Sequence, residues 1–157
     1  SVTIVDAAIQ PAAPEAYDIC FIAGSLHVGN FQPAVVEYVR RYHEALNAMP
    51  TVFLRVPLPA AGQNRDDREG LDQCVRRFLH STAWQPTLVH HVAGAISYSQ
   101  YDFFKRLALQ FIAKKRGQRT MTSRDYDLTD YDELRTFSLA FVRDHQHSQA
   151  QSGGRLG

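Results

Sequence analysis

Continuous apolar runs recur along this chain and are separated by amphipathic stretches. The runs at 18–23, 51–56 and 88–93 contain almost no charge, which is typical of strands buried on both faces of a parallel sheet. The shorter β-branched run Val2–Val5 predicts the tail of another strand. The first long run is bounded by Gly24, where we expect that strand to end.

Apolar residues at three- and four-residue spacing predict four helices between and after these runs. The predicted helices run from an Asn30 cap to Pro50, from a capping box of Asp66 and Glu69 onward, over Tyr101–Arg116, and from a second capping box of Asp130 and Glu133, with Leu134, Phe137 and Phe141 buried. Strands alternating with helices indicate an α/β domain with a mostly parallel sheet. The polar composition of 145–157 predicts a disordered tail.

Composition narrows the class of protein. A chain of 157 residues fits one domain, and 45% hydrophobic with 21% charged residues suits a globular protein. A net charge of +1 gives no drive toward nucleic acid. No apolar run reaches the roughly 18–20 residues of a membrane span, so we expect a cytoplasmic protein. Cys20 and Cys74 lack metal-site spacing and are interpreted as buried thiols.

Two of the predicted strands end in similar small residues. Ala23-Gly24-Ser25 lies at the end of the run 18–23, and Ala93-Gly94-Ala95 lies at the end of the run 88–93. Ligands of parallel sheets bind outside the carboxyl ends of strands, where small residues let a flat ligand approach the backbone. Packing of strand against helix is an equal alternative, and the pattern leaves both open.

The histidines and acidic pairs have mostly structural interpretations. His90 and His91 are adjacent in a predicted strand and point to opposite faces, so they cannot bind one metal ion. His145 and His147 lie in the predicted tail without a third ligand. We therefore expect no metal site.

Three motifs in the same order resemble the flavodoxin-domain family that includes menaquinone-dependent protoporphyrinogen dehydrogenase. They are the Gly-Ser-x-His-x-Gly loop at Gly24–Gly29, Trp84-x-Pro86, and Ala93-Gly94-Ala95-x-x-Tyr98. The likeness extends to about Phe141. It implies a flavodoxin-like, doubly wound parallel sheet with FMN held between two loops.

The resemblance implies a flavin site, an activity and partners. The cofactor-binding residues carried over are Ser25, Leu26, His27, Val28 and Gly29 in the first loop, and Gly94, Ala95, Ile96, Ser97 and Tyr98 in the second. The implied activity passes electrons from protoporphyrinogen IX to a quinone, and because the flavin carries this chemistry no catalytic acid or base is assigned. His27 is either a flavin or substrate contact or an ordinary loop histidine.

The chain also departs from the family pattern. Val28 stands where the family often has an aromatic residue, and Pro57–Gly62 replaces a basic loop, so the substrate stays open. The family's first strand, phosphate loop and first helix have no counterpart here. We therefore expect a flavodoxin-like domain over 1–144 that is N-terminally incomplete. A segment of about 30 residues would be absent, replaced by a segment of another copy, or lost in a rearranged fold. Without that segment we expect poor folding, because a central strand of the sheet would be missing.

Two other functions remain as alternatives. One is a flavodoxin-like electron carrier, and the other is a flavin-free flavodoxin-like binding protein. The basic, aromatic helix predicted over 101–116 either contacts an anionic membrane face, as a quinone acceptor favours, or packs its aromatic residues in the core. Homo-oligomerisation is left open by the sequence.

Overall fold

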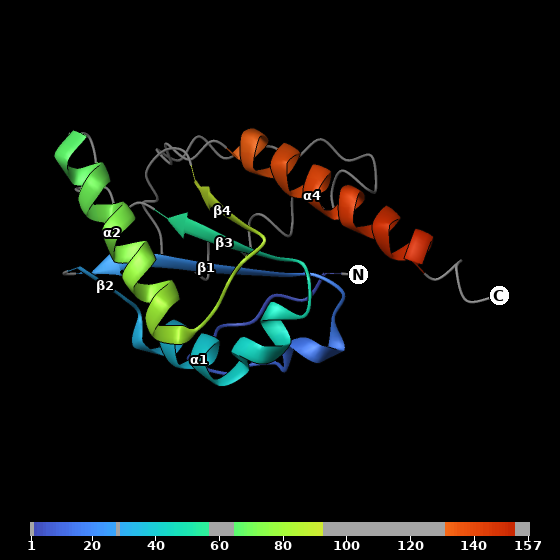
Figure 1. Cartoon of the computed structure of the whole chain (residues 1–157), viewed down its shortest axis with the longest axis horizontal. Helices are drawn as coiled ribbons and strands as arrows, with labels where there is room; N and C mark the ends of the chain where they lie inside the picture. The colour runs from blue at the N-terminus through green and yellow to red at the C-terminus, as the bar shows by residue number, and fades with distance from the viewer. Residues whose placement is uncertain (1, 28, 57–64, 93–130, 153–157) are drawn as a thin grey trace.

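A computed structural model describes residues 2–27, 29–56, 65–92 and 131–152. Within these ranges the elements are η1 (Pro14–Ala16), β1 (Cys20–His27), β2 (Asn30–Phe31), α1 (Pro33–Asn47), β3 (Thr51–Val56), α2 (Arg65–Thr82), β4 (Leu88–His91) and α4 (Tyr131–Ser152). The strands form one sheet in the order β2-β1-β3-β4 (Figure 1). β1, β3 and β4 are parallel and β2 is antiparallel to β1, which confirms the predicted α/β class.

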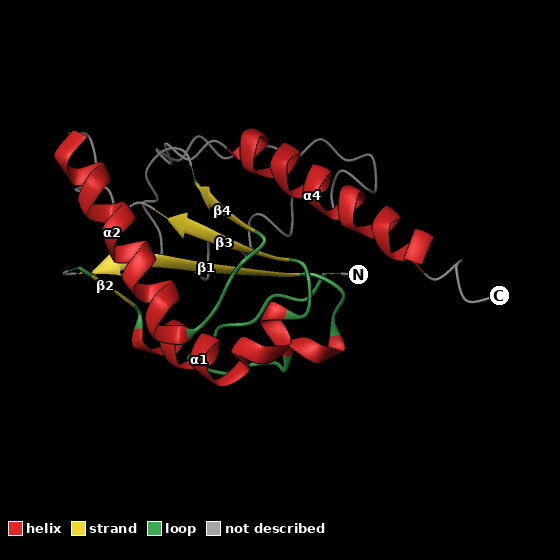
Figure 2. Ribbon diagram, in the orientation of Figure 1, coloured by secondary structure: helices red, strands yellow, loops and turns green. Residues whose placement is uncertain are grey.

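The described elements form three layers. α1 and α2 lie on one side of the sheet and α4 lies on the other (Figure 2). β3 supplies both cores because successive side chains alternate between faces. Phe53 enters the core under α1 and α2, whereas Val52 and Leu54 enter the core under α4. The sequence prediction for this strand, 51–56, is confirmed.

The core under α1 and α2 is dominated by aromatic rings. Phe53 lies within 5.1–5.7 Å, between ring centroids, of Phe31, Phe78 and Trp84. Edge-on and tilted ring contacts of this kind add to the stabilisation from area burial. Phe31 belongs to β2, so this cluster fixes the short strand that returns from the end of β1.

The Trp84-x-Pro86 motif lies at the amino end of β3, where it anchors the sheet. Trp84 is 1% exposed, and its Nε1 donates a hydrogen bond to Thr51 Oγ1 at 3.2 Å. The backbone N–H of Thr51 donates to Thr87 Oγ1, and that of Thr87 donates to the Thr51 carbonyl. A buried indole N–H thus has its partner. This motif has a structural role that lies away from the carboxyl ends of the strands.

Several predicted elements differ from the structure. Val2–Val5 is coil, and Val2 is 70% exposed. Among the described residues, no strand pairs with the β1 edge opposite β3 before Leu26, so a β-branched run at Val2 has no ladder to join. The expectation that Val2–Val5 forms a strand is wrong for these residues.

Two helix ends also differ. α1 is capped at Gln32, because Asn30 is already paired in β2. α4 continues to Ser152, so helix replaces the predicted disorder over 145–152. The His145 ring lies tilted against Phe141 with centroids 4.1 Å apart, and this i,i+4 contact supports the continuation. The helix predicted over 101–116 lies outside the described residues.

Burial of Cys20 gives the fold a pH dependence that can be measured. Burial raises the pKa of this thiol from its usual 9.0 to about 11. The unfolded chain therefore loses the proton first, and the contribution of Cys20 to stability is complete below pH 9 and is lost between pH 9 and 11. We expect this loss to be about 2 kcal/mol.

The measurement compares urea unfolding of the protein and its Cys20→Ala variant across this pH range. The difference in unfolding free energy between them should shrink as the pH rises, because only the parent carries the thiol. Subtracting the variant removes the contribution of the tyrosines that do not interact with Cys20. Tyr38 does interact with it: its pKa is raised by burial and by the nearby Cys20 thiolate, so part of the difference belongs to this pair. A difference that stays constant from pH 8.5 to 11 would show that the thiol is not buried as described.

Candidate functional site

The carboxyl ends of β1, β3 and β4 lie at one edge of the sheet. β1 ends at His27, β3 at Val56 and β4 at His91, and register pairs bring Gly24 beside Arg55 and Arg55 beside His91. Parallel sheets bind ligands at this edge because connecting loops open there. We call this edge the carboxyl rim.

The predicted first loop is a β-hairpin at this rim. β1 does not stop at Gly24 but continues through Ser25, Leu26 and His27. The chain turns near Gly29, which has φ +78°, and returns as β2, with His27 paired to Asn30. Glycine tolerates this left-handed backbone without strain. Val28 lies outside the described residues.

Gly24 makes room for core side chains. A Cβ at this position would lie 3.0 Å from Phe31 Cδ1 and 3.3 Å from Phe53 Cε2. Both distances are shorter than ordinary van der Waals contact. Of the two interpretations of this glycine, the structure therefore supports packing, because the space above its backbone is occupied by aromatic rings.

Ser25 and Gln32 cross-link the base of the hairpin. The Ser25 backbone N–H donates to Gln32 Oε1 at 3.1 Å, and Gln32 Nε2 donates to Ser25 Oγ at 2.9 Å. Ser25 is 5% exposed, and Leu26 packs against the aromatic core. The side chains of both residues thus contact protein, and the two bonds hold the hairpin in place.

The tip of the hairpin is more open. Among the described residues, no atom lies within 4 Å of a Cβ built on Gly29, and Gly29 and Asn30 are both exposed. Backbone groups at such a turn can donate and accept hydrogen bonds with a ligand. Among Ser25, Leu26 and Gly29, it is Gly29 whose described surroundings leave room for a planar ring.

The second predicted loop, Gly94, Ala95, Ile96, Ser97 and Tyr98, lies outside the described residues. Its relation to the hairpin stays a prediction, and so does the assignment of flavin contacts to both loops.

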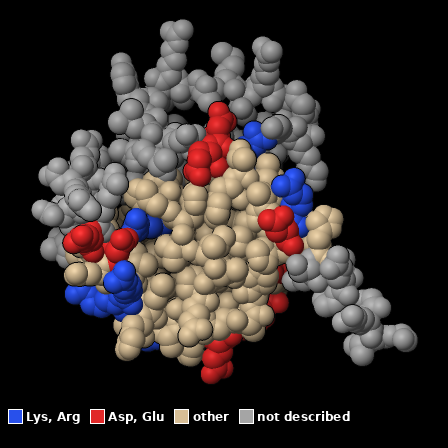
Figure 3. Space-filling view, turned by 45° about the horizontal axis from the view of Figure 1, so that its top comes forward, with Lys and Arg blue, Asp and Glu red and all other residues tan. Residues whose placement is uncertain are grey.

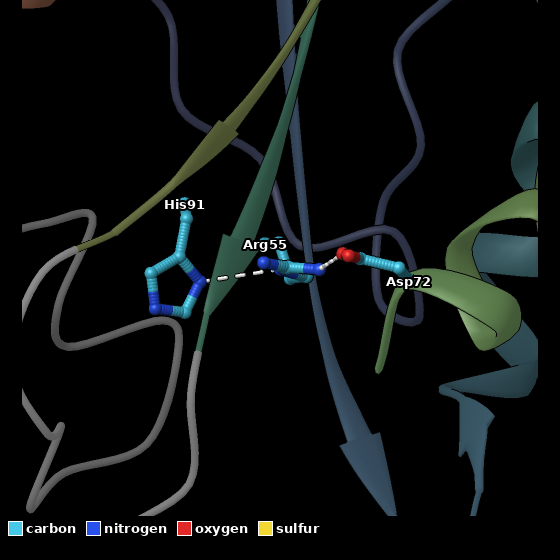
Figure 4. Close-up of polar contacts among 3 residues, drawn as sticks. All are labelled: Arg55, Asp72 and His91. Carbon is cyan, nitrogen blue, oxygen red and sulfur yellow. Dashed lines mark hydrogen bonds and ion pairs between the residues drawn. The ribbon is translucent and has the colours of Figure 1, made fainter. Parts of the chain in front are cut away.

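A charged cluster at the carboxyl rim was not predicted from the sequence. Arg55 lies between His91 and Asp72, which reach it from β4 and α2 (Figure 4). Arg55 Nε donates to His91 Nδ1 at 3.2 Å, and Nη1 lies 2.5 Å from Asp72 Oδ1. Guanidinium nitrogens only donate, so His91 Nδ1 accepts and its ring proton is on Nε2. The one signal in the sequence was a charged residue within the apolar run TVFLRV.

His90 and His91 point to opposite faces, as the sequence predicted. The His90 ring stacks on Phe137 with centroids 3.8 Å apart, and its Nε2 lies 3.2 Å from Glu133 Oε1. Glu133 therefore contacts a residue of the sheet, whereas the sequence predicted a helix-capping role for it. Among the described residues no group of three potential metal ligands is present.

In the space-filling view, uncharged residues fill the middle of the face and charged residues lie toward its margins (Figure 3). None of the described helices is both long and apolar enough to cross a bilayer.

Comparison with known proteins gives consistent matches. A family model described as a flavodoxin domain matches residues 1–123. A protein of Leishmania major named protoporphyrinogen IX dehydrogenase (quinone) is 34% identical over 126 residues, which is 80% of this chain. The protein of the same name from Escherichia coli K12 is 29% identical over 124 residues, or 79% of this chain.

The matched region is only part of these relatives. It covers 54% of the Leishmania protein and 68% of the Escherichia coli protein, so the chain spans about half the length of the first. No solved structure gives a significant match.

Proposed function

Since this chain belongs to the flavodoxin-domain family, we propose that it is an FMN-dependent oxidoreductase that oxidises protoporphyrinogen IX with a quinone as electron acceptor. The observation that carries the proposal is the name that the two relatives share. Their matches and the family match each cover most of the chain. The arrangement of the carboxyl rim is compatible with it.

The hairpin tip fits a flavin better than the strand behind it does. Gly29 has a positive φ, and no atom of the described residues lies within 4 Å of a Cβ built on it, whereas Phe31 and Phe53 fill the space over Gly24. Backbone groups around Gly29 and Asn30 would hold the polar edge of the ring, and the Ser25–Gln32 bonds would keep the turn from moving. Bound FMN would supply the redox chemistry between substrate and acceptor.

The quinone acceptor and the location of the protein belong to the same proposal. A membrane quinone requires the protein to work at a membrane surface, which in this proposal is the cytoplasmic face. The segment 101–116 carries the basic and aromatic residues suited to that contact.

The test is anaerobic turnover. The purified protein is supplied with FMN, protoporphyrinogen IX and a menaquinone analogue, and formation of protoporphyrin IX is followed by its fluorescence. We expect product only when the quinone is present. A flavin-loaded protein whose reduced flavin is reoxidised by the quinone, but which leaves protoporphyrinogen IX unchanged, would overturn the substrate assignment.

A further inference from the structure

Arg55 stands apart from the rest of its strand. The other residues of β3 are buried, and four of the five are apolar. Arg55 follows Phe53 on the face toward α1 and α2 and is the register neighbour of Gly24 and His91. Its side chain is 15% exposed, so a cation is largely enclosed at the carboxyl rim.

Stability alone gives little reason for a cation here. Asp72 is 54% exposed, and an ion pair with one such partner contributes about 0–1 kcal/mol. Enclosing a guanidinium costs desolvation energy, and replacing enclosed ion pairs by apolar residues is often neutral or stabilising. An apolar residue would continue the run on either side of position 55. A requirement other than folding therefore favours the arginine.

The geometry of the cluster prepares one edge of the guanidinium for a ligand. His91 engages Nε and Asp72 engages Nη1, and together they fix the plane of the group (Figure 4). Among the described residues, neither contact uses Nη2. Each terminal nitrogen carries two N–H groups, so Nη2 and the second N–H of Nη1 together can bind a carboxylate through two parallel hydrogen bonds.

We propose that Arg55 is a substrate-recognition residue that binds a carboxylate of the tetrapyrrole at the carboxyl rim. This inference rests on the proposed function, because protoporphyrinogen IX carries two propionate carboxylates. Asp72 orients the guanidinium and competes with the substrate for it. Arg55, which lies outside both predicted flavin loops, thus recognises the acidic groups of the substrate.

Two variants separate recognition from a structural clamp. Arg55→Gln and Asp72→Asn break the same ion pair, but only the first removes the cation. If the cluster merely fastens α2 to the sheet, both variants should behave alike. If Arg55 binds a carboxylate, Arg55→Gln weakens binding. Asp72→Asn leaves binding unchanged or tightens it, because the amide oxygen can still accept the Nη1 hydrogen bond that orients the guanidinium while the competing negative charge is gone.

The experiment is a fluorescence titration of the protein with protoporphyrin IX and with its dimethyl ester, in the same detergent. The ester keeps the ring but has no carboxylate. We expect Arg55→Gln to lower affinity for the diacid by about tenfold, as the loss of a charge-assisted hydrogen bond predicts, and to leave the ester unaffected. Arg55→Lys should retain part of the diacid affinity. Circular dichroism and urea midpoints establish that the variants are folded.

Three results would overturn the inference. They are equal affinity of the parent protein for diacid and ester, unchanged diacid binding by Arg55→Gln, and parallel losses in Arg55→Gln and Asp72→Asn. If the parent protein still oxidises protoporphyrinogen, such a result removes only the role of Arg55. If the parent neither binds nor oxidises the tetrapyrrole, the proposed function fails as well.

Discussion

Replacing Phe53 by alanine is expected to lower the free energy of unfolding by about 3–5 kcal/mol. Phe53 is fully buried, and its ring contacts Phe31, Phe78 and Trp84. Removing the ring leaves a cavity whose walls come from β2, α2 and the loop after α2, so the surroundings cannot close it by a single shift. Urea unfolding followed by circular dichroism gives the free energy.

A matched control is Leu139→Ala on α4. Leu139 is 46% exposed, so its truncation should change the unfolding free energy by no more than about 0.5 kcal/mol. Phe53→Leu provides a milder variant should the alanine variant not fold. A loss below about 1 kcal/mol for Phe53→Ala would mean that the aromatic cluster does not hold β2 against the sheet.

Alanine at Gly24 is expected to destabilise the domain by about 1–3 kcal/mol. The added methyl group would lie 3.0 Å from the Phe31 ring and 3.3 Å from Phe53, so the rings or the strand must move. Because Phe31 lies in β2, the movement should reach the hairpin and weaken any ligand contact at its tip. Stability is measured by urea unfolding.

The same substitution at Gly70 is the internal comparison. Gly70 is exposed within α2, and no atom in the described part of the chain lies within 4 Å of a Cβ built there. Alanine should stabilise this helix by about 0.5–1 kcal/mol because glycine is the poorer helix former. Opposite signs for the two substitutions support the packing account of Gly24, and a stabilising effect at both positions would contradict it.

The elements predicted best were those whose sequence carries a local pattern. The run TVFLRV lies between Pro50 and Pro57, and its prediction as 51–56 is confirmed. The helical stripes that contain Val39 and Phe78 face the core as expected. In each case burial alone dictates the spacing of apolar residues.

The hairpin was mispredicted because tertiary contacts decide its form. Gly24-Ser25 predicts a strand end, because glycine and serine are common where strands and helices stop. In the structure, Phe31 occupies the space over Gly24, and Gln32 bonds to Ser25, so the strand continues. Neither contact can be inferred before the return of the chain through β2 is known.

The Arg55 cluster was missed for a similar reason. Its members lie 17 and 36 positions apart in the sequence and meet only through the register of β3 with β4 and the placement of α2. A single arginine in an apolar run was visible, but its partners were not. The flavin contacts predicted at Gly94–Tyr98 rest on resemblance and remain a prediction.

Flavin binding is tested by the absorption spectrum and FMN content of the protein purified under native conditions. We expect a yellow protein that carries an equimolar amount of FMN, released on denaturation and identified by mass. A well-folded preparation that binds no flavin after incubation with excess FMN would contradict it.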